Sequence, residues 1–364
     1  MAITAFGTND APTVKLWSRA LEREVLPATL IGKFMGRGPD AAVQVKDDLS
    51  KGPGDRVRMT LSMLLNGDGV SGNTSLEGNE ESLTYHTEDV SIDQLRNGVR
   101  NYVRIDSQRV AHDVREDAKI RLRDWWADSL DRSFINQLCG NSAESDTKKT
   151  GLNTVTAPDA DHIIYPGKTT AATSAATLAT AAQHSFCLGL VDKALTKIKM
   201  LNEASNIPVI RPMKGGYYGC ILSPYQVEDM MLGVNTDMDG PSWEEIAQWS
   251  MQGGQISDNP LLTGALGVYK NVVFYEDSRV PKAQDSGTYE ATYNTRVASL
   301  FGAQACFAAF GREGGRPDRF LWNEESFDYG NQHGVSASLI YGLKKAIFNS
   351  DDFGVIALPT FASG

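Results

Sequence analysis

The chain has 364 residues, of which 41% are hydrophobic, so it is long enough for about two or three domains with a packed core. Its formal net charge of −10 argues against the chain as a whole binding nucleic acid. The four cysteines are scattered without a C-x-x-C pair, and there is no signal peptide and no apolar run long enough for a membrane span. These features indicate a soluble protein made in a reducing cytoplasm, with no disulfide framework or zinc site.

The first 55 residues predict an irregular arm with one short amphipathic helix. Apolar side chains recur at helical spacing within Ala11–Leu26, and the glycines and prolines that follow predict a flexible bridge. After a turn at Gly52–Asp55, Arg56–Leu61 alternates polar and apolar residues, as a half-buried strand does.

A polar excursion follows this strand. Asn66–Glu81 contains four glycines, and Val70 and Leu76 are its only large apolar residues, so the segment cannot bury enough surface to fold on itself. Leu83–Ile92 alternates weakly and predicts the returning strand of a long two-stranded arm. An isolated hairpin of this kind is marginally stable in water. The arm is therefore expected to need a neighbouring subunit for the burial that it lacks.

One long amphipathic helix is the clearest element of the sequence. We predict it over Arg104–Leu138, where an apolar residue recurs at every fourth position from Val110 onward and charged residues fill the remaining surface. At 1.5 Å per residue, about 35 residues make a rod on the order of 50 Å long. Its length and dense charge favour a strut lying across a thin sheet over an ordinary core helix.

The rest of the chain predicts a mixed α+β architecture. Asn141–Ala182 is interpreted as a loop and insertion that contributes little to the core. The expected helices are Leu188–Leu201, a helix begun by the capping pair Ser223-Pro224, and Trp243–Met251. The expected strands are Tyr217–Leu222, Val268–Tyr275, Arg296–Phe301, Arg319–Asn323, Ser336–Phe348 and Gly354–Leu358.

The sequence contains no recognisable catalytic constellation. Gly67–Gly72 matches the G-x-G-x-x-G string of dinucleotide-binding proteins, but no helical pattern follows it, so we interpret it as the tip of a loop. The five histidines are dispersed, and the adjacent acidic pairs are interpreted as solvated surface residues. We therefore predict no enzyme, and no catalytic, cofactor-binding or metal-binding residues.

Several strings of the sequence carry a resemblance to a known family. They are KGPGD at 51–55, LEGNEESL at 76–83, VSIDQLR at 90–96, DWWADSLDRSFINQLCG at 124–140, LFGAQ at 300–304 and DYGNQHGVSASLIYGLKKAIFNSDDFGVIAL at 328–358. Together with the order of the parts, they resemble major capsid proteins of tailed bacteriophages with the Hong Kong 97-type fold, and more specifically those of short-tailed phages of the N-four kind. The resemblance extends over residues 15–358, except for a variable insertion at 141–185.

The resemblance implies an α+β fold divided into five parts. Residues 1–55 would form an N-terminal arm and the first peripheral strand region, and residues 56–100 an extended loop that reaches the adjacent subunit. Residues 101–186 would hold the spine helix, peripheral domain and insertion, residues 187–310 the axial domain, and residues 311–364 the returning peripheral strands and C-terminal tail. The inter-subunit contacts expected at the loop tip are Val70, Leu76, Glu77, Gly78, Asn79, Glu80 and Glu81.

By the same resemblance, the chain would be a major capsid protein that assembles into pentamers and hexamers of an icosahedral virion shell in the bacterial host cytoplasm. The shell would enclose double-stranded DNA without sequence-specific binding, with a portal, a scaffolding protein and a decoration protein as partners, and without a membrane. Because the helix predicted at Ala11–Leu26 begins close to residue 1, the scaffolding protein is expected to be a separate chain. The alternatives are the shell of an encapsulin-type compartment, which shares the fold, and a soluble enzyme of unknown class.

Some shells of this fold are locked by isopeptide bonds from a lysine of the extended loop. No lysine occurs between Gly52 and Ala118 of this chain, and arginine takes basic positions such as Arg56 and Arg58. Since the guanidinium group is not a substitute for an amine nucleophile, we predict no lysine-based covalent crosslink from this loop.

Overall fold

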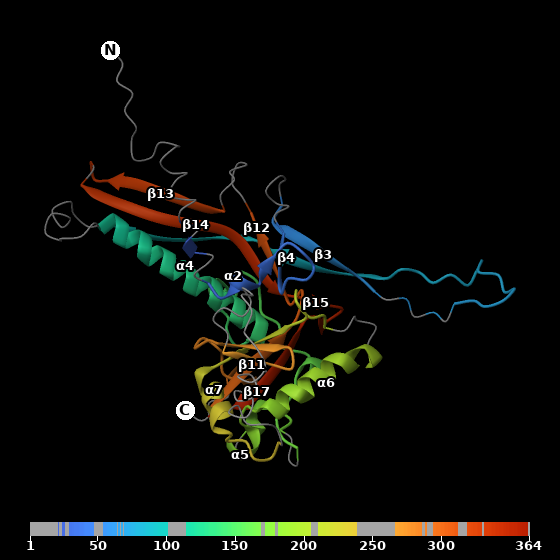
Figure 1. The fold of residues 1–364 in the computed structure, drawn as a ribbon. Helices are drawn as coiled ribbons and strands as arrows, with labels where there is room; N and C mark the ends of the chain where they lie inside the picture. The colour runs from blue at the N-terminus through green and yellow to red at the C-terminus, as the bar shows by residue number, and fades with distance from the viewer. Residues whose placement is uncertain are drawn as a thin grey trace.

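The computed structural model of the chain describes residues 21, 24–25, 29–46, 54–63, 65, 67, 69–100, 114–168, 172–178, 181–204, 210–238, 266–285, 288–289, 294–311, 319–329 and 331–362. Within these residues, two β-sheets share one long helix, and a two-stranded arm projects from the body (Figure 1). Of the helix predicted at Ala11–Leu26, only Leu21, Glu24 and Val25 are described, and all three are helical. The helix predicted at Trp243–Met251 lies outside the described residues.

The described helices and strands confirm a mixed α+β fold. The helices are α2 (Ile31–Phe34), α4 (Val114–Cys139), α5 (Ala181–His184), α6 (Leu188–Ala204) and α7 (Pro224–Leu232), with 3-10 helices η2 (Thr147–Lys149), η3 (Ala160–His162) and η4 (Ala175–Thr177). The strands are β1 (Met35–Gly36), β2 (Val43–Lys46), β3 (Arg56–Ser62), β4 (Tyr85–Ser91), β5 (Asp93–Arg100), β6 (Tyr218–Leu222), β7 (Gly267–Tyr269), β8 (Val272–Glu276), β9 (Gln284–Asp285), β10 (Thr288–Tyr289), β11 (Thr295–Phe301), β12 (Cys306–Phe310), β13 (Phe320–Phe327), β14 (Gln332–Lys345), β15 (Ile347–Phe348), β16 (Asp351–Asp352) and β17 (Val355–Phe361).

Strand β14 is the centre of the six-stranded sheet. It pairs antiparallel with β5 along one edge and with β13 and then β12 along the other, and the sheet continues through β2 to β1. Every second side chain of β14 from Val335 to Tyr341 is buried in the same core cluster as the apolar side of α4. Figure 1 shows β13 and β14 running alongside α4. The period-two alternation of the strand thus gives the sheet a face for the helix.

Helix α4 confirms the predicted four-residue spacing. Its buried positions include Ala118, Leu122, Trp126, Leu130, Phe134 and Leu138. Trp126 lies edge-on to Phe320 of β13, with ring centroids 5.3 Å apart. The predicted start at Arg104 lies outside the described residues. The helix is followed by Gly140 at φ +64°, a conformation that glycine adopts without steric cost.

The five-stranded sheet follows the order β17-β11-β6-β8-β7, with β6 and β8 parallel and the other neighbours antiparallel. Side chains of β8 alternate between two cores. Val272 and Phe274 pack with α6 and α7, whereas Val273 and Tyr275 belong to the core around α4. This sheet is therefore buried on both faces, and α4 packs against both sheets of the molecule.

The helix predicted after Ser223-Pro224 is confirmed as α7, together with its cap. The Ser223 hydroxyl accepts a hydrogen bond from the Gln226 amide at 3.3 Å, and the Gln226 side chain accepts one from the Ser223 amide at 2.9 Å. Pro224 occupies the first helical position, where its missing N–H costs nothing.

The single strand predicted at Val268–Tyr275 is wrong. The segment forms the β7–β8 hairpin, and its two turn residues, Lys270 and Asn271, have φ values of +43° and +69°. Two successive residues of positive φ match the twist of a tight antiparallel hairpin. Apolar residues flank the turn on both sides, so the segment resembles one strand. The turn itself, Lys-Asn, lacks the glycine that usually marks a tight hairpin turn.

The prediction that Asn141–Ala182 contributes little to the core is also wrong. The segment has short helices, and it places Ala172, Ala175 and Leu178 in the core cluster around α4. Its Ile163 forms a parallel bridge to Ala357 of β17. Small apolar residues in a polar stretch gave a weak hydrophobic signal, although each is buried.

The predicted divisions of the chain differ from the sheets at three strands. The predicted extended loop at residues 56–100 includes β5, and the predicted axial domain at residues 187–310 includes β12, but both strands belong to the six-stranded sheet. The predicted peripheral strands of residues 311–364 include β17, but β17 pairs with β11 in the five-stranded sheet. Strand pairing between distant segments decides membership of a sheet, and the pattern of one segment does not reveal its partner.

No helix in the described part of the chain is long and apolar enough to span a membrane.

Candidate assembly interface

The arm predicted from the sequence is present as the antiparallel pair β3–β4. Its register runs from Arg56 opposite Ser91 to Ser62 opposite Tyr85. Inward-facing Val57, Met59 and Val90 are buried near the body. They form a separate apolar cluster whose other buried members are Phe307, Ala309, Ala346, Phe348 and Phe353. The base of the arm is therefore anchored by its own subunit.

Polar contacts complete this anchor. The Asn153 side chain accepts a hydrogen bond from the Ser91 amide at 3.1 Å and donates one to the Ser91 carbonyl at 3.0 Å, so it pairs with the arm as a neighbouring strand would. Lys344 forms an ion pair with Glu88. A Cβ added to Gly342 would lie 1.9 Å from the Ser91 carbonyl oxygen, so only glycine permits this approach of β14 to the arm.

An ion pair on the outside of the arm joins its two strands. The Arg58 Nε and Nη2 atoms donate to the two oxygens of Asp89 at 2.8 and 3.0 Å. The hydrogen bonds raise the pKa of the Arg58 guanidinium and lower the pKa of the Asp89 carboxyl. Both groups are solvated, so this pair orients the strands more than it stabilises them.

The distal part of the arm is not buried by any part of the chain that the structure describes. Every residue from Gly69 to Tyr85 is exposed. Figure 1 shows this segment extending away from the body. Large apolar side chains of this segment are strongly exposed, with Leu76 at 60%, Leu83 at 58% and Tyr85 at 55%, and Leu65 just before it is 61% exposed. Apolar side chains spaced along a projecting segment make this stretch a candidate contact surface for another chain.

The outermost segment nevertheless has local order. The Asn79 amide donates to the Leu76 carbonyl at 3.0 Å, and Gly78 takes φ +89°, which together describe a type II turn. The Asn79 side chain donates to the Ser75 carbonyl at 3.0 Å, and Glu80 accepts from the Gly78 amide at 2.7 Å. We refer to Ser75–Glu81 as the tip turn. It contains six of the seven residues predicted as inter-subunit contacts, and Val70 lies on the preceding stretch, also exposed.

The Gly67–Gly72 string, described except for Asp68, lies between β3 and β4, and β4 rather than a helix is the next described element. It lacks the strand–turn–helix context that a dinucleotide site requires. No group of three or more metal-ligating side chains occurs in the described ranges. Burial raises the pKa of the Cys139 thiol to about 12 and also raises those of the other three cysteines, so none of them resembles a reactive thiolate.

Sequence reasoning missed a buried polar junction beneath the arm. Lys345, at the end of β14, pairs with Asp352 at 2.7 Å, and the two side chains are 1% and 3% exposed. Asp159 accepts from the Asp352 amide at 2.7 Å and lies 2.8 Å from the His162 Nδ1 atom. We refer to Lys345, Asp352, Asp159 and His162 as the polar junction. The sequence indicated this junction only by a lysine within an otherwise apolar strand. The adjacent Lys344 is also a lysine in that strand but is more exposed, so the sequence did not show which of the two is buried.

The geometry describes an anchored arm with an uncovered tip, and comparison with known proteins supplies its context. The family described as phage capsid protein matches residues 5–363. The chain belongs to this family. It is 28% identical to the major capsid protein of Pseudomonas phage KPP25, over 96% of this chain and 94% of that protein. The resemblance noted in the sequence to phage major capsid proteins is confirmed, whereas the N-four subgroup stays a prediction.

Solved structures agree with this assignment. The capsid of Ralstonia phage GP4 matches with a TM-score of 0.76 and 31% identity, over 91% of this chain and 90% of that chain. The capsid of cyanophage Pam1 matches with a TM-score of 0.67 over 91% of both chains, and at 22% identity it supports the fold alone. The phage capsid α+β fold is therefore confirmed, and these matches favour a phage shell over an encapsulin-type compartment.

Proposed function

We propose that this phage capsid protein is the major subunit of an icosahedral shell and that it assembles as pentamers and hexamers around double-stranded DNA. The observation that carries the proposal is the arm, whose base is buried in its own subunit while its distal half presents apolar side chains to solvent. A closed shell buries such a segment because each subunit can cover the arm of the next around a cyclic ring.

The parts of the fold correspond to proposed roles. The β3–β4 arm would be the extended loop, with Val70, Leu76, Glu77, Gly78, Asn79, Glu80 and Glu81 in contact with the adjacent subunit. Helix α4 would be the spine, the six-stranded sheet the peripheral domain and the five-stranded sheet the axial domain. The family is one of structural proteins, and we propose that the chain has no enzymatic role. A separate scaffolding protein, a portal and a decoration protein are the proposed partners, with assembly in the host cytoplasm.

Deleting Asn66–Glu80 tests the role of the arm. Because the described part of this segment makes no contact with the body, the shortened subunit should fold with an unchanged unfolding midpoint. It should nevertheless fail to close shells in electron micrographs taken under conditions in which the wild type assembles. Thr74→Ser, which removes no large apolar surface from the same segment, should assemble normally. Normal shells from the deletion variant would refute the proposal.

The absence of lysine from the arm gives a second test. We propose that mature shells contain no lysine-based crosslink from this loop, since its basic residues are arginines. Mature shells boiled in detergent should therefore run as a single band near 39.6 kDa on a denaturing gel. A ladder of covalent multimers, with crosslinked peptides that contain residues of the arm, would contradict this expectation.

A further inference from the structure

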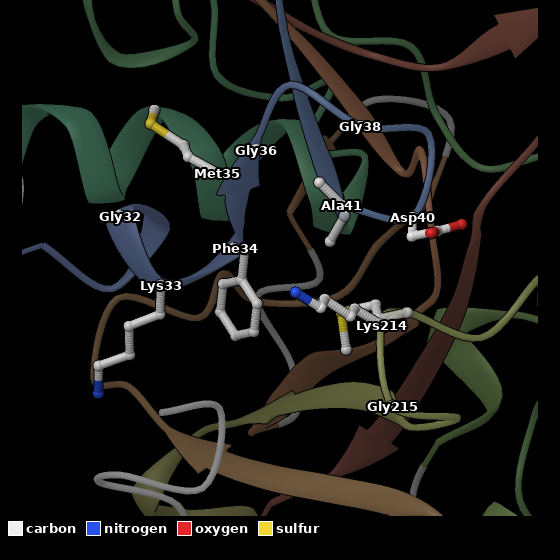
Figure 2. Close-up of a pocket in the computed structure, with 12 residues that line it drawn as sticks. Gly32, Lys33, Phe34, Met35, Gly36, Gly38, Asp40, Ala41, Lys214 and Gly215 are labelled. Carbon is white, nitrogen blue, oxygen red and sulfur yellow. The ribbon is translucent and has the colours of Figure 1, made fainter. Parts of the chain in front are cut away.

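A groove opens between the N-terminal part of the described chain and the turn before β6 (Figure 2). It encloses about 860 Å³, and its walls are Gly32–Gly36, the loop that follows β1 and the Met213–Gly215 turn. Half-buried Met35 gives it an apolar lining, together with the small exposed parts of Phe34 and Met213, which are 3% and 4% exposed. A volume of this size lies within the range of protein pockets that accept a ligand or a short peptide segment.

Both walls of the groove are fixed. The Asp131 carboxylate of α4 accepts hydrogen bonds from the Leu30 and Ile31 amides, each at 3.0 Å, which holds the start of α2. The Lys214 amide donates to the Asp40 carbonyl at 3.2 Å and ties the opposite wall to the loop. Phe34 is itself held by edge-on contacts with Phe301 and Tyr275, at centroid separations of 5.0 and 5.1 Å. The groove is therefore formed before any partner binds.

Lysines outnumber carboxylates in the groove, since Lys33 and Lys214 line it and Asp40 is the one acidic residue of the lining. Figure 2 shows the Lys214 side chain lying across the groove with its ammonium end toward Phe34. Lys214 is exposed and makes no ion pair with any residue that the structure describes. Lys33 stands on the other wall, with its ammonium 5.9 Å from the centre of the Tyr275 ring. An occupant with an apolar side chain beside carboxylates would match this lining.

The tip turn has that chemistry. Leu76 projects at 60% exposure, Glu77, Glu80 and Glu81 follow it closely, and no basic residue occurs from Gly69 to Thr84. The hydrogen bonds within the turn already fix its conformation, which reduces the entropy that binding would cost. Since the arm extends away from its own body (Figure 1), the turn is presented to another molecule.

We propose that this groove receives the tip turn of a second copy of the chain, with Leu76 against the apolar lining and Glu77 and Glu80 facing Lys214. The inference rests on the proposed function and adds the place at which the arm docks. Charge complementarity of this kind selects the partner and sets the register of the contact, while burial of the leucine contributes most of the affinity.

Zero-length crosslinking of assembled wild-type shells tests the contact directly. A carbodiimide joins a carboxylate to an amine only where the two groups touch. Peptide mass spectrometry should then find the arm peptide, through Glu77 or Glu80, joined to Lys214. If shells form but the arm peptide is joined only to lysines elsewhere or to none, the docking site is wrong, even though the arm still assembles shells.

Two substitutions of Lys214 separate charge from the reactive amine. Lys214→Arg keeps the charge, so shells should form as in the wild type while the crosslink disappears. Lys214→Glu places like charges together and should raise the subunit concentration needed for assembly by about tenfold or more. Adding Glu77→Lys and Glu80→Lys to that variant should restore most of the loss.

These measurements also distinguish the two proposals. Normal shells from the variant that lacks Asn66–Glu80 would refute the proposed function itself. If that variant fails to assemble but Lys214→Glu assembles normally, only the proposed docking site is refuted. Lys214 lies on an exposed turn, so the unfolding midpoint of each variant should match the wild type, and this is checked before assembly is measured.

Discussion

The tip turn and the polar junction lie on the same chain and meet opposite demands. At the junction, ionisable groups are taken out of water, and the subunit supplies a partner for each: Lys345 for Asp352, and His162 for Asp159. At the tip, apolar side chains such as Leu76 are left in water, and the subunit supplies no cover. The difference separates the polar groups that the subunit pairs within itself from the apolar side chains that it leaves exposed, which the proposed function assigns to assembly.

Breaking the buried ion pair should give the largest loss of subunit stability. Lys345→Met leaves the Asp352 carboxylate buried without its partner, and this should lower the free energy of unfolding by about 3–5 kcal/mol. Urea denaturation of unassembled subunits measures the loss. Lys344→Met is the matched control because Lys344 is more exposed and should cost less than about 1 kcal/mol. Equal losses for the two lysines would contradict the expected difference between the fully buried pair and the partly exposed pair of Lys344 and Glu88.

Removing the amide that joins the arm to the body should have a smaller effect. Asn153→Ala loses both hydrogen bonds to Ser91 and leaves partly buried backbone groups unpaired, so the free energy of unfolding should fall by about 2–3 kcal/mol. Asn79→Ala, in the tip turn, should change the free energy of unfolding by less than about 0.5 kcal/mol. If Asn79→Ala destabilises the unassembled subunit as much as Asn153→Ala, the tip is not independent of the body.

The smallest expected effect is a dependence on pH. Burial alone would raise the pKa of Asp159, but hydrogen bonds from His162 and from the Asp352 amide outweigh it and lower the pKa to about 2. The unfolded carboxyl titrates near 3.8, so this contribution is fully present above that pH and is lost as the pH falls from 3.8 through 2.

Urea midpoints measured between pH 5 and pH 2 test this dependence. Asp159→Asn should flatten the fall of the midpoint over the interval from 3.8 to 2. Asp161→Asn is the control because the Asp161 side chain is 75% exposed, and it should leave the slope as in the wild type. An unchanged slope in Asp159→Asn would place the acid sensitivity of the subunit elsewhere.

Local patterns in the sequence predicted the elements whose causes are local. The four-residue spacing of α4, the alternation of β3 and the cap at Ser223 each depend on neighbours within a few residues. The exposed tip was predictable for a related reason, since Asn66–Glu81 has too little apolar surface to fold on itself.

Features that depend on distant partners could not be predicted in this way. Val355–Phe361 reads as a buried strand, but nothing in it specifies β11 as its neighbour. Asn153 looks like an ordinary loop residue until Ser91 lies beside it. Of two adjacent lysines at the end of β14, only the direction of the strand decides that Lys345 is the buried one. The groove likewise combines α2 with a turn far along the chain.

The central position of β14 has a consequence for the order in which the subunit is made. Gly334 pairs with Arg100, so the sheet beneath the arm remains incomplete until the ribosome has passed residue 334. At roughly 5–20 residues per second, the arm exists for at least about ten seconds before the sheet that supports it is finished. The exposed apolar side chains of the arm are therefore made well before the strand that completes their support.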